Sequence, residues 1–245
     1  MKQIAKVMTI AALALTLSVG AQAQFRQSVF FNANLPVGGF ASNVGDHLLL
    51  PLGYTEIGKD ASFGFGLGYR ASYRFDVGVG MVAPFAQADF FWNTISASLS
   101  EEYTQARSKS TPTYFNIPVQ LGVSYLYDEL PWSDITAFAE FGIGADMLFI
   151  TPEGPCTYTT AGVSATTLKL AYKPTTAIAF SIGAGAYFGR HVSAGIYYYG
   201  LGKHNIEYTS STFDKLDAAS QLAYNSGDVQ TRTVGSLALR IGFHF

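Results

Sequence analysis

Apolar and polar residues alternate along most of the chain. In the segment SFGFGLGYRASYRF, residues 62–75, every second residue is Phe, Leu, Tyr or Ala, and the residues between them are Ser, Gly and Arg. Alternation with period two is typical of a β-strand whose two faces meet different surroundings. It predicts eight strands, over residues 25–34, 61–73, 77–92, 113–127, 135–150, 175–188, 192–206 and 231–245.

Two of these strands are irregular. The alternation in 77–92 changes phase near Pro84, which predicts a β-bulge there. The strand 192–206 contains three consecutive tyrosines, Tyr197 to Tyr199, so its faces are ambiguous.

The connections between the predicted strands alternate between long and short. Segments 35–60, 93–112, 151–174 and 207–230 are long, whereas 74–76, 128–134 and 189–191 are short. Barrels of the bacterial outer membrane have short periplasmic turns and long external loops. The pattern therefore predicts an all-β fold, a closed antiparallel up-and-down transmembrane β-barrel. Both termini of the barrel domain are then expected at the periplasmic side.

The last strand, VGSLALRIGFHF, predicts how the barrel closes. We expect it to pair with the first strand, because no backbone N–H can stay unpaired in lipid and the sheet must have no edge. Its odd positions from Leu237 to Phe245 are apolar and are expected to face lipid, whereas Arg240 and His244 are expected to face the bore.

The N-terminus and the composition agree with export. Lys2 and Lys6 precede an apolar run and the small-residue site AQA, so residues 1–23 are predicted to be a cleaved signal peptide and 24–245 the barrel domain. Charged residues make up 13% of the chain, against about 25% in ordinary domains. Cleavage removes two Lys and no acid, and the resulting net negative charge argues against nucleic acid as a partner.

At this point the chain resembles a known family, the small bacterial outer-membrane barrels of the OmpA/OmpX-like type. The closing strand carries this resemblance, and YFNIPVQLGVSYLY (114–127) resembles a strand of "porin family" barrel domains. The resemblance implies an outer-membrane location and a terminal residue, Phe245, that the barrel-assembly machinery reads. Because the chain stops at Phe245, we expect no periplasmic peptidoglycan-binding domain.

Charges inside the strands predict an ion-pair network in the bore. Arg on the lipid face near the midplane costs about 2–4 kcal/mol, whereas inside the barrel it can pair with a carboxylate. We expect these residues to plug the bore as structural filling: Arg26, Arg70, Arg74, Glu140, Asp146, Arg232 and Arg240. Eight strands leave an interior that side chains fill, so a general diffusion pore is not expected.

The sequence favours no active site. His191 and Ser193 have the spacing found in lipid A deacylases but lie in a predicted periplasmic turn, and Asp46-His47 and Glu101-Glu102 offer only isolated protease-like groups. The four His have no metal-ligand spacing, and neither a cofactor nor a metal is predicted. We therefore do not expect an enzyme.

The expected role is that of a structural or surface-binding protein embedded in outer-membrane lipid, whose external loops meet an extracellular partner. A narrow conduit for ions or apolar solutes is the alternative, and an outer-membrane hydrolase is a weaker one. The apolar segment 47–54 in the first loop leaves open whether a further hairpin makes ten strands. The ligand and the oligomeric state are not determined by the sequence.

Overall fold

The computed structural model describes residues 25–41, 61–95, 113–127, 134–151, 156–158, 166–168, 171–207 and 230–245. The predicted signal peptide, the segment 47–54 and most of the external loops lie outside these residues. Among the described residues, no helix is long and apolar enough to cross a membrane.

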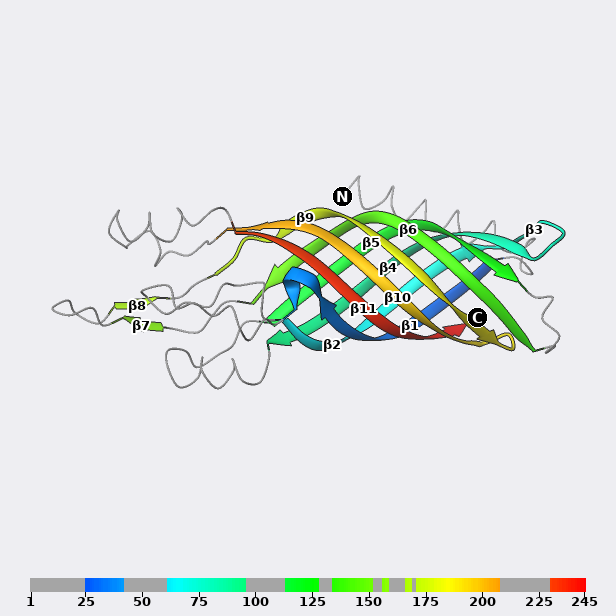
Figure 1. Cartoon of the computed structure of the whole chain (residues 1–245), viewed down its shortest axis with the longest axis horizontal. Coiled ribbons are helices and arrows are strands. Elements are labelled where there is room, and N and C mark those ends of the chain that lie inside the picture. Colours follow the sequence, from blue (N-terminus) through cyan, green and yellow to red (C-terminus); the bar gives the residue numbers. More distant parts are fainter. Residues whose placement is uncertain are drawn as a thin grey trace, which may run out of the picture.

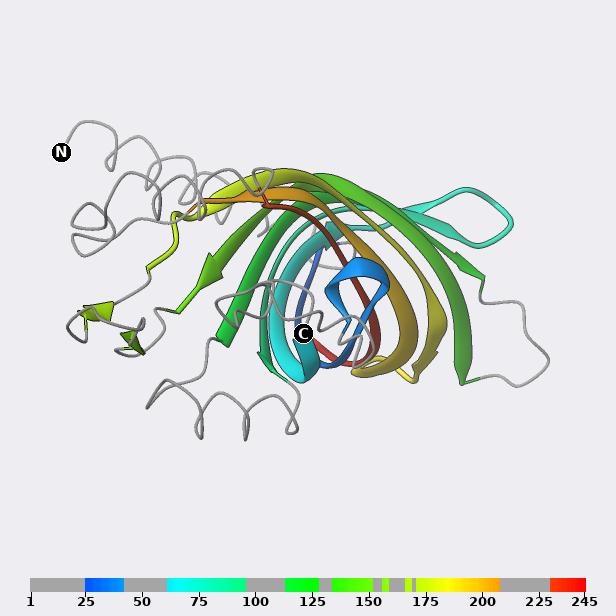
Figure 2. The same cartoon turned by 60° about the vertical axis from the view of Figure 1, so that its left-hand side comes forward.

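Eight long strands form one antiparallel sheet that closes on itself (Figure 1). They are β1 Phe25–Val37, β2 Ala61–Tyr73, β4 Met81–Ile95, β5 Thr113–Tyr127, β6 Ile135–Ile150, β9 Thr175–Phe188, β10 Val192–Ile206 and β11 Gln230–His244. Around the barrel each strand pairs with the next in this list, which is an up-and-down order. The strands tilt and curl around a common bore (Figure 2).

The short elements lie outside this ring of eight. A 3-10 turn, η2 Gly38–Phe40, follows β1, and the two-residue strand β3 Phe75–Asp76 extends the β2–β4 hairpin. In the fifth connection, β7 Cys156–Tyr158 and β8 Thr166–Leu168 pair only with each other. Because β1 pairs directly with β2 and the ring closes through β2 and β4, the barrel has eight strands and the ten-stranded alternative is wrong.

The closing seam joins β1 to β11, as expected from the last strand. Their register runs from Ser28 opposite His244 to Val37 opposite Gly235. Beyond it, the backbone groups of Gln27 and Phe245 exchange two hydrogen bonds of 3.0 Å. This pairing leaves the sheet without a free edge, which is the condition for a sheet to stand in lipid.

The two faces of the barrel differ sharply in polarity. On β11 the outward residues Leu237, Leu239, Ile241, Phe243 and Phe245 are all exposed, whereas Ser236, Arg240 and His244 are buried. The same alternation of exposed apolar residues with buried residues runs along the other strands. The prediction for the last strand is confirmed. We call the end of the barrel that holds the short turns and Phe245 the periplasmic end.

The third strand begins later than predicted. It spans Met81–Ile95 rather than 77–92, because a tight turn occupies 77–80. Gly78 and Gly80 have φ angles of +89° and +79°, which glycine adopts without steric penalty. Asp76 Oδ1 accepts a hydrogen bond of 2.8 Å from the Gly78 N–H and fixes the turn.

The predicted bulge at Pro84 is wrong. The register between β4 and β5 passes through Pro84, opposite Val123, without a shift. Pro84 instead lies where the pairing of β4 changes from β2 to β3. The register shifts that do occur lie between Ala61 and Gly64 and between Gly200 and Gly202.

The tyrosine run of β10 follows simple alternation. Tyr197 and Tyr199 point into the barrel and are buried, and Tyr198 is exposed on the outer face. The shift at Gly202, whose φ is +92°, follows directly after this run.

Candidate functional site: the charged bore

The middle of the bore holds two arginine–carboxylate pairs. Alternation turns residue 70 of β2, residue 89 of β4, residue 140 of β6 and residue 240 of β11 toward the barrel axis, where all four side chains are buried. Buried charges need both a counter-ion and hydrogen bonds to offset the loss of water. The contacts described next supply both.

The first pair joins Arg70 to Glu140 through a two-pronged hydrogen bond. Arg70 Nη1 donates to Glu140 Oε2 at 2.7 Å, and Arg70 Nη2 donates to Oε1. Arg70 Nε also donates to Gln87 Oε1 at 2.8 Å, and the Ser124 hydroxyl donates to Glu140 Oε2 at 3.0 Å. The planar guanidinium matches the carboxylate geometry, which makes this type of pair the strong one.

The second pair joins Arg240 to Asp89. Arg240 Nη2 lies 3.1 Å from Asp89 Oδ1 and 3.3 Å from Oδ2. Arg240 Nε donates to Asn32 Oδ1 at 3.0 Å and Nη1 to Gln87 Oε1 at 3.1 Å, while Nη2 also contacts the Tyr199 hydroxyl. Asp89 was not among the residues expected in the network, because its pairing with Arg240 depends on the three-dimensional structure.

Both pairs cross the bore. In the order of strands around the barrel, β2 and β6 are three positions apart, and so are β11 and β4. Gln87 accepts hydrogen bonds from both arginines, and Arg240 Nη1 lies 3.8 Å from Glu140 Oε1, so the two pairs form one network. This network ties opposite walls of the barrel together.

Aromatic rings pack against the two arginines. The guanidinium carbon of Arg70 lies 3.9 Å from the ring centre of Phe85, and that of Arg240 lies 4.2 Å from the ring centre of Tyr197. Phe30 lies between them, at 5.0 Å from the first and 4.3 Å from the second. Such cation–π contacts fill the space around each cation and stabilise it where water is excluded.

Glycine makes room for the carboxylate on β4. A Cβ built on Gly68 would lie 2.0 Å from Asp89 Oδ1, closer than any real contact. The alternation of glycine with apolar residues in β2 thus leaves the space that the network occupies.

Asp146 has a different partner from the one we expected. We predicted an arginine, but Asp146 Oδ2 lies 3.2 Å from His204 Nε2 on β10, and both side chains are buried. His204 Nδ1 lies 2.7 Å from the Thr175 hydroxyl, and its Nε2 is 2.9 Å from the Leu201 carbonyl. The alternation had placed Asp146 in the bore correctly but could not tell which wall it would reach.

The other predicted network members lie toward the ends of the barrel. Arg26 is near the start of β1, and Arg74 follows β2 at the periplasmic end, with its guanidinium carbon 4.9 Å from the Tyr187 ring centre. Arg232 lies near the opposite end of β11. The arginine–carboxylate pairs at the middle of the bore are those of Arg70 and Arg240.

A histidine cluster closes the periplasmic end. His244 Nδ1 lies 2.7 Å from the Ser28 hydroxyl, and its Nε2 lies 2.7 Å from the Ser193 hydroxyl. His191 does not activate Ser193, because its Nδ1 contacts the His244 carbonyl at 3.0 Å. Ser193 and His244 are both buried, so the H-x-S spacing does not form the catalytic pair that sequence analysis considered.

The remaining chemical candidates gain no support from the described part of the chain. Asp46-His47 and Glu101-Glu102 lie outside it. Within it, no group of three or more His, Cys, Asp or Glu could hold a metal ion.

An apolar layer lies in the extracellular half of the bore, beside buried polar groups such as Asp146 and His204. Phe40 of η2 packs edge-on against Tyr114 of β5, with ring centroids 5.3 Å apart, and both side chains are buried. Ile95, Leu148 and Ile206 are buried in the same cluster. The bore is thus filled along its length by this apolar layer, the Asp146–His204 pair and the two arginine–carboxylate pairs.

Three solved structures are similar to this chain at low sequence identity. Neisserial surface protein A (NspA) is 12% identical, with 90% of this chain and 95% of that chain covered and a TM-score of 0.42. The Yersinia pestis attachment invasion locus protein Ail is 12% identical, with 91% and 98% covered and a TM-score of 0.42. Pseudomonas aeruginosa OprG is 12% identical, with 91% and 95% covered and a TM-score of 0.41.

No protein-family model matches the chain, and no curated protein is significantly similar to it. The placement in the membrane follows from the chain's own surface. A closed barrel with an apolar outer face and buried charges in its bore is stable in lipid and unstable in water. The chain is an eight-stranded transmembrane β-barrel of the outer-membrane type.

Proposed function

We propose that this protein is a non-catalytic outer-membrane barrel with a sealed bore, which acts as a structural and surface-binding protein through its external loops. The observation that carries the proposal is the pair of arginine–carboxylate bridges that cross the bore, Arg70–Glu140 and Arg240–Asp89. An open channel would leave such charges in contact with water, whereas these four side chains are at most 4% exposed.

The apolar layer supports the same function. Phe40 and Tyr114 lie on the extracellular side of the charged network, so an ion entering from outside would first lose its water among rings. Moving an isolated charge into such surroundings costs several kcal/mol even after relaxation. Eight-stranded barrels in general have just enough interior for side chains.

Planar-bilayer recording tests the sealed bore. The purified barrel should give no steady conductance above that of the lipid alone. The matched variant carries Arg240→Ala, Asp89→Ala and Phe40→Ala, which removes one bridge and one ring of the apolar layer, and it should conduct. Steady conductance of the unmodified barrel would instead favour the narrow conduit.

The loops carry the surface-binding part of the proposal. The connections 96–112 and 208–229 are far longer than the periplasmic turns 77–80 and 189–191. A photoreactive residue inserted into 208–229 should cross-link to an extracellular partner on intact cells, and the same residue in the turn 189–191 should not. Absence of any loop-specific product would contradict a surface-binding role.

Phe245 is the residue that we expect the barrel-assembly machinery to read. Its side chain is 61% exposed on the outer face, while its backbone is held by Gln27. The variant Phe245→Ser should lower the amount of folded barrel in the outer membrane. The same substitution at the neighbouring lipid-facing residue, Phe243→Ser, measures the loss of a lipid contact alone and should lower the amount of folded barrel less. An equal amount of folded barrel in cells would overturn the assignment.

A further inference from the structure

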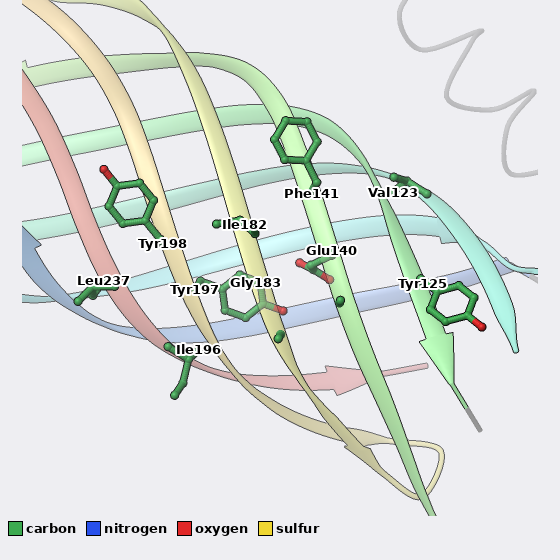
Figure 3. A pocket seen from close by; sticks show the side chains of 12 residues that line it. Val123, Tyr125, Glu140, Phe141, Ile182, Gly183, Ile196, Tyr197, Tyr198 and Leu237 are labelled. Atoms are coloured by element: carbon green, nitrogen blue, oxygen red, sulfur yellow. The ribbon is translucent and has the colours of Figure 1, made fainter. Parts of the chain in front are cut away.

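A wide groove interrupts the lipid-facing wall of the barrel. It has a volume of about 750 Å³ and crosses β5, β6, β9, β10 and β11 in the periplasmic half (Figure 3). Two neighbouring alanines, Ala139 and Ala184, are paired across β6 and β9 in its floor. The larger side chains of Tyr125, Ile196 and Phe141 stand around them and are exposed on the outer face.

The small side chains continue from the groove toward the periplasmic end. Ala137 pairs with Ala186, and Ala186 pairs with Ala194, one outward position below the groove floor. Below them, the turn Gly189–His191 joins β9 to β10 and carries the exposed Arg190. The described residues offer Arg190 no carboxylate within ion-pair distance.

The spacing between Arg190 and the groove fits within one leaflet of a bilayer. Ala184 lies four residues from the end of β9 at Phe188, which is about 13 Å along the strand at roughly 3.3 Å per residue, and Arg190 follows in the turn. A strand tilt of about 40° reduces this to about 10 Å along the membrane normal, so Arg190 in the turn lies within about one leaflet of the groove floor, where one leaflet is half of a hydrocarbon core of about 30 Å. A phospholipid whose phosphate binds Arg190 would therefore have an acyl chain that runs along these alanines into the groove.

We propose that this groove binds one acyl chain of an anionic phospholipid of the periplasmic leaflet, with the lipid phosphate held by Arg190. The groove belongs to the face that lipid already covers, so an acyl chain is the occupant continuous with that interface. An unfilled apolar groove loses dispersion contacts on one side, and a flexible chain restores them. The Arg190 guanidinium is positively charged and therefore favours the phosphate of an anionic phospholipid.

Native mass spectrometry of barrels released from nanodiscs tests this site. The nanodiscs contain phosphatidylcholine with a minority of phosphatidylglycerol of the same chain composition. The unmodified barrel should retain one phosphatidylglycerol. Ala184→Leu fills the groove floor and should abolish retention, and Arg190→Gln should weaken it roughly fivefold, the factor equivalent to about 1 kcal/mol per basic residue near a membrane surface.

Matched controls separate the site from general effects. Ala86→Leu adds the same bulk at an outward position of β4, which does not line the groove, and Lys173→Gln removes a cation at the extracellular end. Both should retain lipid as the unmodified barrel does. If Ala184→Leu does not fold, as judged by heat-modifiable gel mobility, Ala139→Leu makes the same test.

Three results would overturn the proposal. The first is loss of all lipid from the unmodified barrel, and the second is retention that neither groove variant changes. The third is a dimer without lipid whose assembly Ala184→Leu disrupts, because a second copy of the chain would then occupy the groove. None of these results depends on whether the bore conducts.

Discussion

Removing the cation of the Arg70–Glu140 bridge tests whether the bore excludes water. In the variant Arg70→Met, Glu140 stays buried and keeps only the Ser124 hydroxyl at 3.0 Å and Arg240 Nη1 at 3.8 Å. Breaking a buried ion pair on one side costs about 3–5 kcal/mol. The remaining contact with Arg240 places our expectation at the lower end, about 3 kcal/mol of unfolding free energy.

The double variant Arg70→Met, Glu140→Met supplies the internal control. It removes both charges at similar volume, and replacements of this kind are often neutral or stabilising, so it should unfold within about 1 kcal/mol of the unmodified barrel. Urea unfolding from lipid vesicles, followed by the fluorescence of Trp92 on the outer face, measures these free energies.

If Arg70→Met alone lowers the unfolding free energy by less than about 1 kcal/mol, the reasoning is refuted, because that is the contribution of an exposed ion pair screened by water. Lys173→Met, which breaks the exposed Lys173–Glu207 pair, gives the size of such a screened loss in the same barrel.

Three further predictions concern the wall and the periplasmic end, all measured as urea unfolding free energies in vesicles. Gly68→Ala should destabilise by about 1–3 kcal/mol, because its Cβ would displace Asp89, and a neutral effect would contradict the close approach. Leu121→Arg, at the outward middle of β5, should cost about 2–4 kcal/mol in bilayers, and a smaller loss would place this face outside the lipid. His244→Ala should cost about 1–3 kcal/mol by leaving the buried Ser193 hydroxyl without its partner, and an unchanged midpoint would mean that water replaces the imidazole.

The sequence alone determined the strands and the direction in which each side chain points. Period-two alternation is a local property of extended backbone, so it assigned Arg240 to the bore and Leu239 to the lipid. The alternation of long and short connections can also be read directly from the sequence, and it determined the up-and-down order of the strands. The errors were local too: the turn at 77–80 was absorbed into a strand, because Val77 and Val79 alternate with Gly78 and Gly80 as strand residues would.

Only the tertiary structure decided which groups meet across the bore and which surface is hollow. Partners such as Arg240 and Asp89 depend on strand tilt, register and closure, which together set the level and angle at which each side chain reaches the axis. His204 faces Asp146 for this reason, although the sequence analysis predicted an arginine as the partner of Asp146. The lipid-facing groove has the same origin, since alanines far apart in the chain become neighbours only when the strands pair in register.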